Sequence, residues 1–277
     1  MISDESPESI IAPPRRLSLH LGELWEHREL IYFFTWRDVK VKYKQTFLGI
    51  FWAILQPVFM MLIFTFFFGR ALQVSIPGMS YPAFVLSGLV IWNLFSSGIT
   101  NAGNSMVNNA NIIKKIYFPR LIIPISSTLS AAVDFFFAAL VLGAMLIYYQ
   151  QPITAYIFIA WPAAILLTLT GILGLGCWLG ALNIKYRDFR YVIPFLVQAM
   201  MFLTPVIYPI SFIPYRWAEI LVAINPMFAA VTLFRAPMTP EPIEPALMFI
   251  SIGANLLFVL FGLLYFKKTE TYFADLA

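Results

Sequence analysis

The feature that most constrains this chain is a run of 24 consecutive residues, 46–69, that contains no formal charge. At about 1.5 Å of rise per residue, a helix of this length crosses the hydrocarbon core of a bilayer, which is roughly 30 Å thick. A polar and basic segment, residues 36–45, directly precedes the run. Because Lys and Arg are retained at the cytoplasmic ends of membrane helices, we expect the first span to begin on the cytoplasmic side.

The composition extends this interpretation to the whole chain. Of the 277 residues, 60% are hydrophobic and only 12% are charged, whereas about 25% of the residues of a soluble domain are charged. We therefore predict an all-α membrane protein, with one transmembrane domain over residues 17–277 behind a disordered cytoplasmic tail, residues 1–16. The six predicted spans cover approximately residues 47–68, 81–103, 121–149, 155–183, 192–208 and 246–266.

The basic residues support this topology. Six spans place both termini on the same side of the membrane. If that side is the cytoplasm, only Arg70, Arg216 and Arg235 of the eighteen Lys and Arg residues lie outside. This asymmetry favours six spans with both termini cytoplasmic.

Two segments are expected to lie at the membrane without crossing it. Residues 17–35 alternate apolar and charged positions at helical spacing, which favours an amphipathic interface helix over an ordinary soluble helix. Residues 215–224 and 227–235 are each too short to cross, so we expect a re-entrant pair over 215–235. Such backbone must be buried in protein or line a cavity, which suggests an outer gate. The candidate gate residues are Tyr215, Trp217, Pro226 and Phe228.

The sequence indicates a transport subunit and no enzyme. It contains no G-x-x-x-x-G-K-[ST] phosphate-binding loop, no H-E-x-x-H pattern and no cysteine pair. Asp134 is almost the only ionisable residue inside the predicted spans, which gives little support to ion-coupled transport. It either contributes to a conduit or forms a helix–helix hydrogen bond to Ser, Thr or Asn. Aromatic and amide side chains suit a sugar path, although packing is an open alternative. The candidate conduit residues are Trp92, Asn93, Phe95 and Asp134.

Residues 108–120 form a compact basic loop between the second and third spans. Charge retention alone explains its cations, but its alternation of apolar and basic residues also suits docking of a cytoplasmic partner. The predicted docking residues are Ile112, Ile113, Lys114, Lys115, Ile116, Tyr117, Phe118 and Arg120. In the fourth span, Gly176 and Gly180 form a small-xxx-small pair, which predicts close helix packing.

Three stretches together resemble a known family. Residues 36–46 (WRDVKVKYKQT), followed by Leu48-Gly49, Trp52 and Gln56-Pro57, resemble the start of the membrane subunit of type-2 ABC exporters for polysaccharides. Residues 111–124, with KKIYFPR, and residues 185–188, KYRD, are similar to the second and third signatures of that family. The resemblance covers about residues 24–268 and is closest to the O-antigen and lipopolysaccharide permease group (Wzm-like). Capsule and teichoic-acid permeases are similar, and an ion-driven lipid-linked-sugar flippase is the alternative from another class.

The resemblance implies a homodimer in the bacterial inner membrane that works with two copies of a cytoplasmic ABC ATPase subunit. That partner binds ATP and Mg, so this chain needs no cofactor of its own, and nucleic acid is not a partner. The implied substrate is a polyprenyl-pyrophosphate-linked polysaccharide, moved from the cytoplasmic to the outer face. Cations ahead of the first span are candidates for attracting the lipid's head group. These cations are Arg37, Lys40, Lys42 and Lys44.

Overall fold

The computed structural model describes residues 21–44, 49, 51–270 and 273. The predicted tail, 1–16, and the first residues of the interface helix lie outside this part. Within it, the regular elements are helices. The α-helices are α1 (Leu21–Glu26), α2 (Arg28–Lys44), α3 (Phe51–Phe64), α4 (Tyr81–Asn108), α5 (Ala110–Lys115), α6 (Ile122–Tyr148), α7 (Ile157–Lys185), α8 (Phe189–Phe202), α9 (Arg216–Ala223), α10 (Met227–Arg235) and α11 (Pro245–Thr269). A π-helical segment, η1 (Thr65–Ala71), continues α3, and a 3-10 turn, η2 (Ile210–Phe212), precedes α9.

Five helical segments in the described residues are long and apolar enough to cross a membrane: α3 with η1, α4, α6, α7 and α11. They agree with five of the six predicted spans. The predicted span at 192–208 differs, because α8 ends at Phe202 and has only 14 residues. Pro205 and Pro209 follow it and lack the backbone N–H that a longer helix would use. A sixth long crossing is obtained only if α9 and α10, bent by 98°, are counted as one span.

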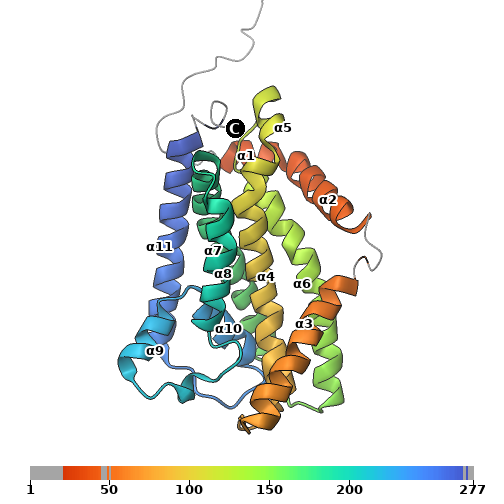
Figure 1. Cartoon of the computed structure of the whole chain (residues 1–277), viewed down its shortest axis with the longest axis vertical. Helices are drawn as coiled ribbons and strands as arrows, with labels where there is room; N and C mark the ends of the chain where they lie inside the picture. The colour runs from red at the N-terminus through yellow and green to blue at the C-terminus, as the bar shows by residue number, and fades with distance from the viewer. Residues whose placement is uncertain (1–20, 45–48, 50, 271–272, 274–277) are drawn as a thin grey trace, which may run out of the picture.

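The long helices stand side by side, with α4 between α6, α7 and α3 (Figure 1). The helices differ in how much of their apolar 18-residue stretch is buried inside the protein. This share is 78% for α4 and 11% for Phe51–Ala71. Figure 1 places α1, α5 and the last turns of α11 at one end, which we call the α5 end, and α9 at the opposite end, the α9 end.

Close helix packing around α4 depends on small residues. A Cβ atom added at Gly176 of α7 would lie 2.6 Å from the Cβ of Ala102 of α4, and one at Gly180 would lie 3.2 Å from the Ala102 carbonyl oxygen. The predicted small-xxx-small packing is thereby confirmed, and its partner is α4.

Helix α2 continues to Lys44, beyond the predicted interface-helix end at residue 35. The last part of the interface segment, from Arg28, and the basic segment up to Lys44 therefore form one helix, which slopes from the α5 end along α6 (Figure 1). The hydroxyl of Thr35 donates to the carbonyl oxygen of Ile31 at 2.7 Å and lies 3.5 Å from the carbonyl oxygen of Ser126 on α6. The basic residues are consequently positioned by α6, the third span, as well as by the membrane surface.

Candidate functional site

The basic loop 108–120 is attached to the bundle by its own apolar side chains. Ile113 on α5 and Phe118 are buried, with 1% and 3% of their surfaces exposed. The ring of Phe118 packs against Phe34 of α2, with centroids 5.7 Å apart. The guanidinium of Arg120 lies 5.1 Å from the Phe118 ring centroid. These contacts fix the loop against α2 and the core.

Other docking candidates face outward. Tyr117 is 91% exposed and Ile116 is 60% exposed, and Lys114 and Lys115 are exposed beside them. Ile112 is partly buried. The backbone leaves α5 in an extended conformation at Ile116.

The predicted docking set therefore needs a correction. Ile113 and Phe118 were expected to be anchors for a partner, but they hold the loop from within. The sequence of a mixed apolar and basic loop does not show which side chains point into the protein. The residues that hold the loop and the residues available to a partner were therefore not distinguished. Ile116 and Tyr117 form the exposed apolar surface of the loop, which we call the 116–117 face.

Arg37, a predicted head-group residue, is engaged inside the protein. Its guanidinium donates to a carboxylate oxygen of Asp38 at 2.7 Å and to the amide oxygen of Asn109 at 2.8 Å. It also lies 4.7 Å from the centroid of the Phe34 ring. Arg37 thus links α2 to the end of α4.

Lys42 and Tyr43 of α2 both donate to Asp134 of α6, one to each carboxylate oxygen. Burial, and then the hydrogen bond to the Asp134 carboxylate, raise the pKa of the Tyr43 hydroxyl. Asp134 was expected to contribute to a conduit or to bind Ser, Thr or Asn; among the described residues, its two carboxylate oxygens accept instead from Lys42 and Tyr43. Of the four proposed head-group cations, Lys40 and Lys44 are exposed and form no ion pair with another described residue.

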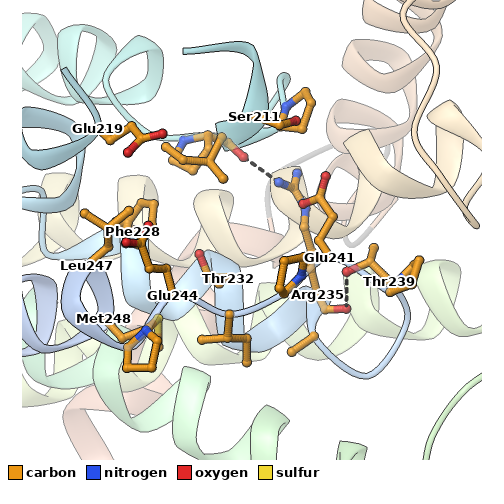
Figure 2. Close-up of a pocket in the computed structure, with 18 of the residues that line it drawn as sticks. Ser211, Glu219, Phe228, Thr232, Arg235, Thr239, Glu241, Glu244, Leu247 and Met248 are labelled. Carbon is orange, nitrogen blue, oxygen red and sulfur yellow. Dashed lines mark hydrogen bonds between the residues drawn. The ribbon is translucent and has the colours of Figure 1, made fainter. Parts of the chain in front are cut away.

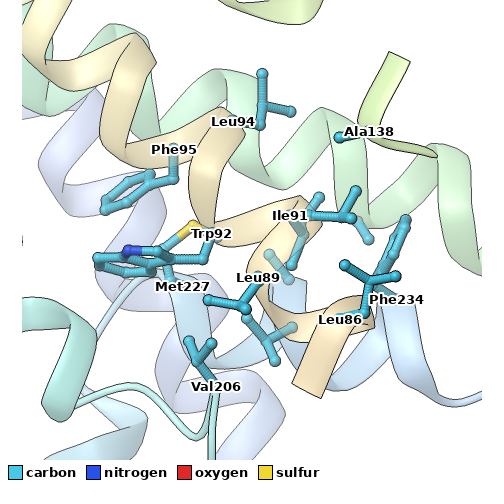
Figure 3. Close-up of a cluster of buried hydrophobic side chains, with 14 of the residues drawn as sticks. Leu86, Leu89, Ile91, Trp92, Leu94, Phe95, Ala138, Val206, Met227 and Phe234 are labelled. Carbon is cyan, nitrogen blue, oxygen red and sulfur yellow. The ribbon is translucent and has the colours of Figure 1, made fainter. Parts of the chain in front are cut away.

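Two of the predicted conduit residues belong to the hydrophobic core. Trp92 and Phe95 of α4 are 3% and 0% exposed, with ring centroids 5.4 Å apart (Figure 3). Met227 of α10 and Val206 lie in the same cluster. The two rings are therefore packing residues, the alternative that the sequence left open. Asn93 is only partly buried.

The re-entrant candidate is a sharp corner between α9 and α10. Asn225 occupies the corner: its side-chain oxygen accepts from the Met227 amide at 3.0 Å, and its side-chain nitrogen donates to Thr204 Oγ1 at 2.8 Å. Of the four gate candidates, Tyr215 and Trp217 are exposed, with stacked rings 6.0 Å apart. Pro226 and Phe228 are buried behind them.

Arg235, counted in the sequence as an outer cation, is 5% exposed at the end of α10. It donates to the carbonyl oxygens of Phe84, Pro205 and Val206, the first at 3.0 Å, and to Ser87 Oγ at 3.2 Å. The guanidinium lies 3.7 Å from the Phe84 ring centroid. The sequence did not lead us to predict that Arg235 is buried and bound to backbone carbonyls. An arginine at the end of an apolar segment too short to cross a membrane could have indicated it.

A cavity of about 640 Å³ lies beside Arg235 at the α9 end (Figure 2). Glu219, Glu241 and Glu244 lie in its wall. Arg216 donates to both Glu219, at 2.8 Å, and Glu244, at 2.6 Å, and so joins α9 to the start of α11. This arginine lowers the pKa of Glu244, whereas burial raises the pKa of Glu241 against the attraction of Arg235.

Known proteins with similar sequences are membrane transport components. The chain is 28% identical over 255 residues to the O-antigen export system permease protein RfbA of Myxococcus xanthus, covering 90% of this chain and 96% of that protein. It is 27% identical over 265 residues to the protein of the same name from Klebsiella pneumoniae, covering 94% and 98%. It is 24% identical over 243 residues to the polysialic acid transport protein KpsM of Escherichia coli, covering 84% and 91%.

The family assignment rests on a separate match. Residues 29–239, from α2 to the loop after α10, match the ABC-2 type transporter family. Together with the long apolar helices, this match identifies a multi-pass membrane protein. The chain belongs to the ABC-2 type transporter family.

Proposed function

We propose that this chain is the membrane subunit of an ATP-driven exporter that moves a polyprenyl-pyrophosphate-linked polysaccharide of the O-antigen type across the bacterial inner membrane. Two copies would form the path, and two copies of a separate cytoplasmic ATPase would bind ATP and Mg. The α5 end would be cytoplasmic, in agreement with the distribution of Lys and Arg. The re-entrant pair α9–α10 would close the outer end.

The observation that carries the proposal is the 116–117 face on its rigid support. Ile116 and Tyr117 are exposed directly after Lys114 and Lys115, while Phe118 and Ile113 fasten the same loop to α2 and the core. Exposed aromatic side chains on a fixed support suit a docking surface, because aromatic anchors tend to carry much of an interface's binding energy. Movement of the loop would reach α2 through Phe34 and Arg37, and α6 through its first turn.

The contacts of α2 also refine the head-group hypothesis. Arg37 and Lys42 are engaged with Asp38, Asn109 and Asp134, so Lys40 and Lys44 are the better candidates for attracting a pyrophosphate. Arg37 and Lys42 would instead fix the orientation of α2. An ion-driven flippase receives less support, since the one carboxylate near the middle of α6 is held by Lys42 and Tyr43.

A capsule exporter is the second candidate, favoured by the similarity to a polysialic acid transport protein. The O-antigen relatives are more similar over a larger share of the chain, so we prefer them.

Deletion of the chain in its native cell tests the proposal. We expect a lipid-linked glycan to accumulate on the cytoplasmic face, and an ABC ATPase to co-purify with the tagged wild-type chain. Normal surface glycan after deletion, with no accumulated lipid-linked glycan, would reject the export function.

A further inference from the structure

We propose that the cavity at the α9 end binds a short stretch of the exported glycan that carries no anionic group. This inference rests on the proposed export function and assigns a substrate class to it. At about 640 Å³, the cavity falls in the range of about 300–1,000 Å³ that is usual for small-molecule sites.

The cavity walls combine apolar surfaces with hydrogen-bonding side chains. Phe228 of α10, together with Leu247 and Met248 of α11, supplies apolar area, and prolines line much of the remainder. Thr232, Glu241 and Ser211 add hydroxyl and carboxylate groups, and Figure 2 shows these residues around one space. A sugar ring has an apolar C–H face and hydroxyl groups at its edge, so both kinds of wall have a counterpart on it.

The prolines make this a pre-formed site. Their φ angles are fixed by the ring, and their backbones have no N–H donor. Arg216 further ties one wall to another through Glu219 and Glu244. A ligand that enters a pre-formed cavity has less ordering cost to offset than one that must fold a loop around itself.

The charges select against an acidic sugar. Glu219, Glu241 and Glu244 are all in the wall, and the first two are partly buried. Four of the five N–H groups of the Arg235 guanidinium are already directed to backbone carbonyls and Ser87, which leaves at most one donor for a carboxylate or phosphate. An anionic residue would therefore meet like charges without a new cationic partner.

Glu241 is the most suitable acceptor for sugar hydroxyl groups. Glu219 and Glu244 are engaged by Arg216, whereas Glu241 lies beside Arg235 in Figure 2 and its side chain forms no hydrogen bond with another described residue. An ionised carboxylate can accept hydrogen bonds from two hydroxyl groups. Thr232, which also lines the cavity, can both donate and accept.

The test uses the complex of this chain and its ATPase in lipid nanodiscs. The probes are short oligosaccharides prepared by mild acid release from the lipid-linked glycan that accumulates in cells lacking the chain, with oligosialic acid as an anionic comparison. Saturation-transfer NMR measures their binding. Glu241→Gln and Thr232→Val are each expected to weaken oligosaccharide binding by about tenfold.

Matched substitutions outside the cavity are the controls. Glu26→Gln on α1 and Thr100→Val on α4 are expected to leave binding unchanged, and all variants should retain the wild-type elution profile. Unchanged binding in both cavity variants, tighter binding of oligosialic acid, or an accumulated glycan with an anionic repeat would overturn the inference while leaving export intact. If no lipid-linked glycan accumulates, the export function fails and this inference fails with it.

Discussion

Two regions of the molecule stabilise a charge below the surface in different ways. At the α2 side, Asp134 is held by side chains of Lys42 and Tyr43, which belong to a helix that starts at the α5 end. At the α9 end, Arg235 is enclosed by main-chain carbonyls from α4 and from the segment after α8. The contacts that Lys42 and Tyr43 make with Asp134 can change when α2 shifts. The carbonyl oxygens around Arg235, in contrast, are held in place by the backbone fold. We therefore expect α2 to be adjustable and the Arg235 site to be a rigid support.

The largest effect is expected from Phe118→Ala. Phe118 is buried against Phe34, so its loss should reduce the free energy of unfolding by about 3–5 kcal/mol, as is usual for a large-to-small core change. Thermal unfolding of the detergent-solubilised protein measures this. Tyr117→Ala is the matched control, with little expected change because Tyr117 is 91% exposed. Equal effects of the two substitutions would show that the loop is not held as described.

Arg235→Met should also be strongly destabilising. It removes the donor for three carbonyl oxygens and Ser87, and a buried polar group left without a partner costs about 1–3 kcal/mol. We expect a loss of about 3 kcal/mol, measured by the same thermal unfolding. Arg187→Met, at an exposed position after α7, is the control.

Gly88→Ala, on α4, should also disturb the Arg235 site. The new Cβ would lie 2.7 Å from the Val206 carbonyl oxygen and would collide with the Arg235 guanidinium. A clear loss of stability is expected, and it should be smaller in the Arg235→Met background because the clash with the guanidinium is then removed. Full additivity of the two substitutions would contradict the proposed rigid support.

A double-mutant cycle on Lys42→Met and Asp134→Asn should give a coupling free energy of about 1 kcal/mol. The value is modest because the Lys42 side chain is 42% exposed, so water competes for its ammonium group. Chemical or thermal unfolding of the four proteins gives the coupling. Lys40→Met combined with Asp134→Asn should be additive, and additivity in the first cycle as well would remove the proposed link between α2 and α6.

The sequence predicted the elements better than their contacts. Long uncharged segments were sufficient to place five spans, because length and hydropathy are local properties of the chain. The partner of Asp134 was not predictable, since Lys42 lies in a segment that was interpreted as a membrane anchor and as a possible head-group site. Likewise, Phe118 and Tyr117 are adjacent in the same loop, and only the extended backbone after α5 determines which one is buried. Arg235 was counted as an outer cation from the order of the spans, and its burial among backbone carbonyls was not predicted.

The smallest effect concerns pH at the cavity. Burial raises the pKa of Glu241 above its ordinary value of 4.5, so the folded state binds this proton more tightly than the unfolded state. The resulting stabilisation is fully present below the ordinary value and is lost as the pH rises through the raised pKa. The stability advantage of Glu241→Gln over the wild type should therefore be larger at pH 7 than near pH 4.5.

Glu244 provides the contrast within this prediction. Arg216 lowers its pKa, so its contribution is present above the ordinary value and is lost only as the pH falls through the lowered pKa. Unfolding temperatures of the wild type, Glu241→Gln and Glu244→Gln across this pH range separate the two carboxylates. A pH-independent difference between the wild type and Glu241→Gln would contradict the assignment.

The most direct test of the central claim is the amount of ATPase subunit that co-purifies with Tyr117→Ala. Because the 116–117 face is exposed while its support is buried, we expect at least about a tenfold loss of ATPase association with unchanged thermal stability. Tyr215→Ala, an exposed tyrosine at the α9 end, should retain the ATPase fully. Wild-type ATPase association and wild-type export by Tyr117→Ala would contradict the proposed docking surface.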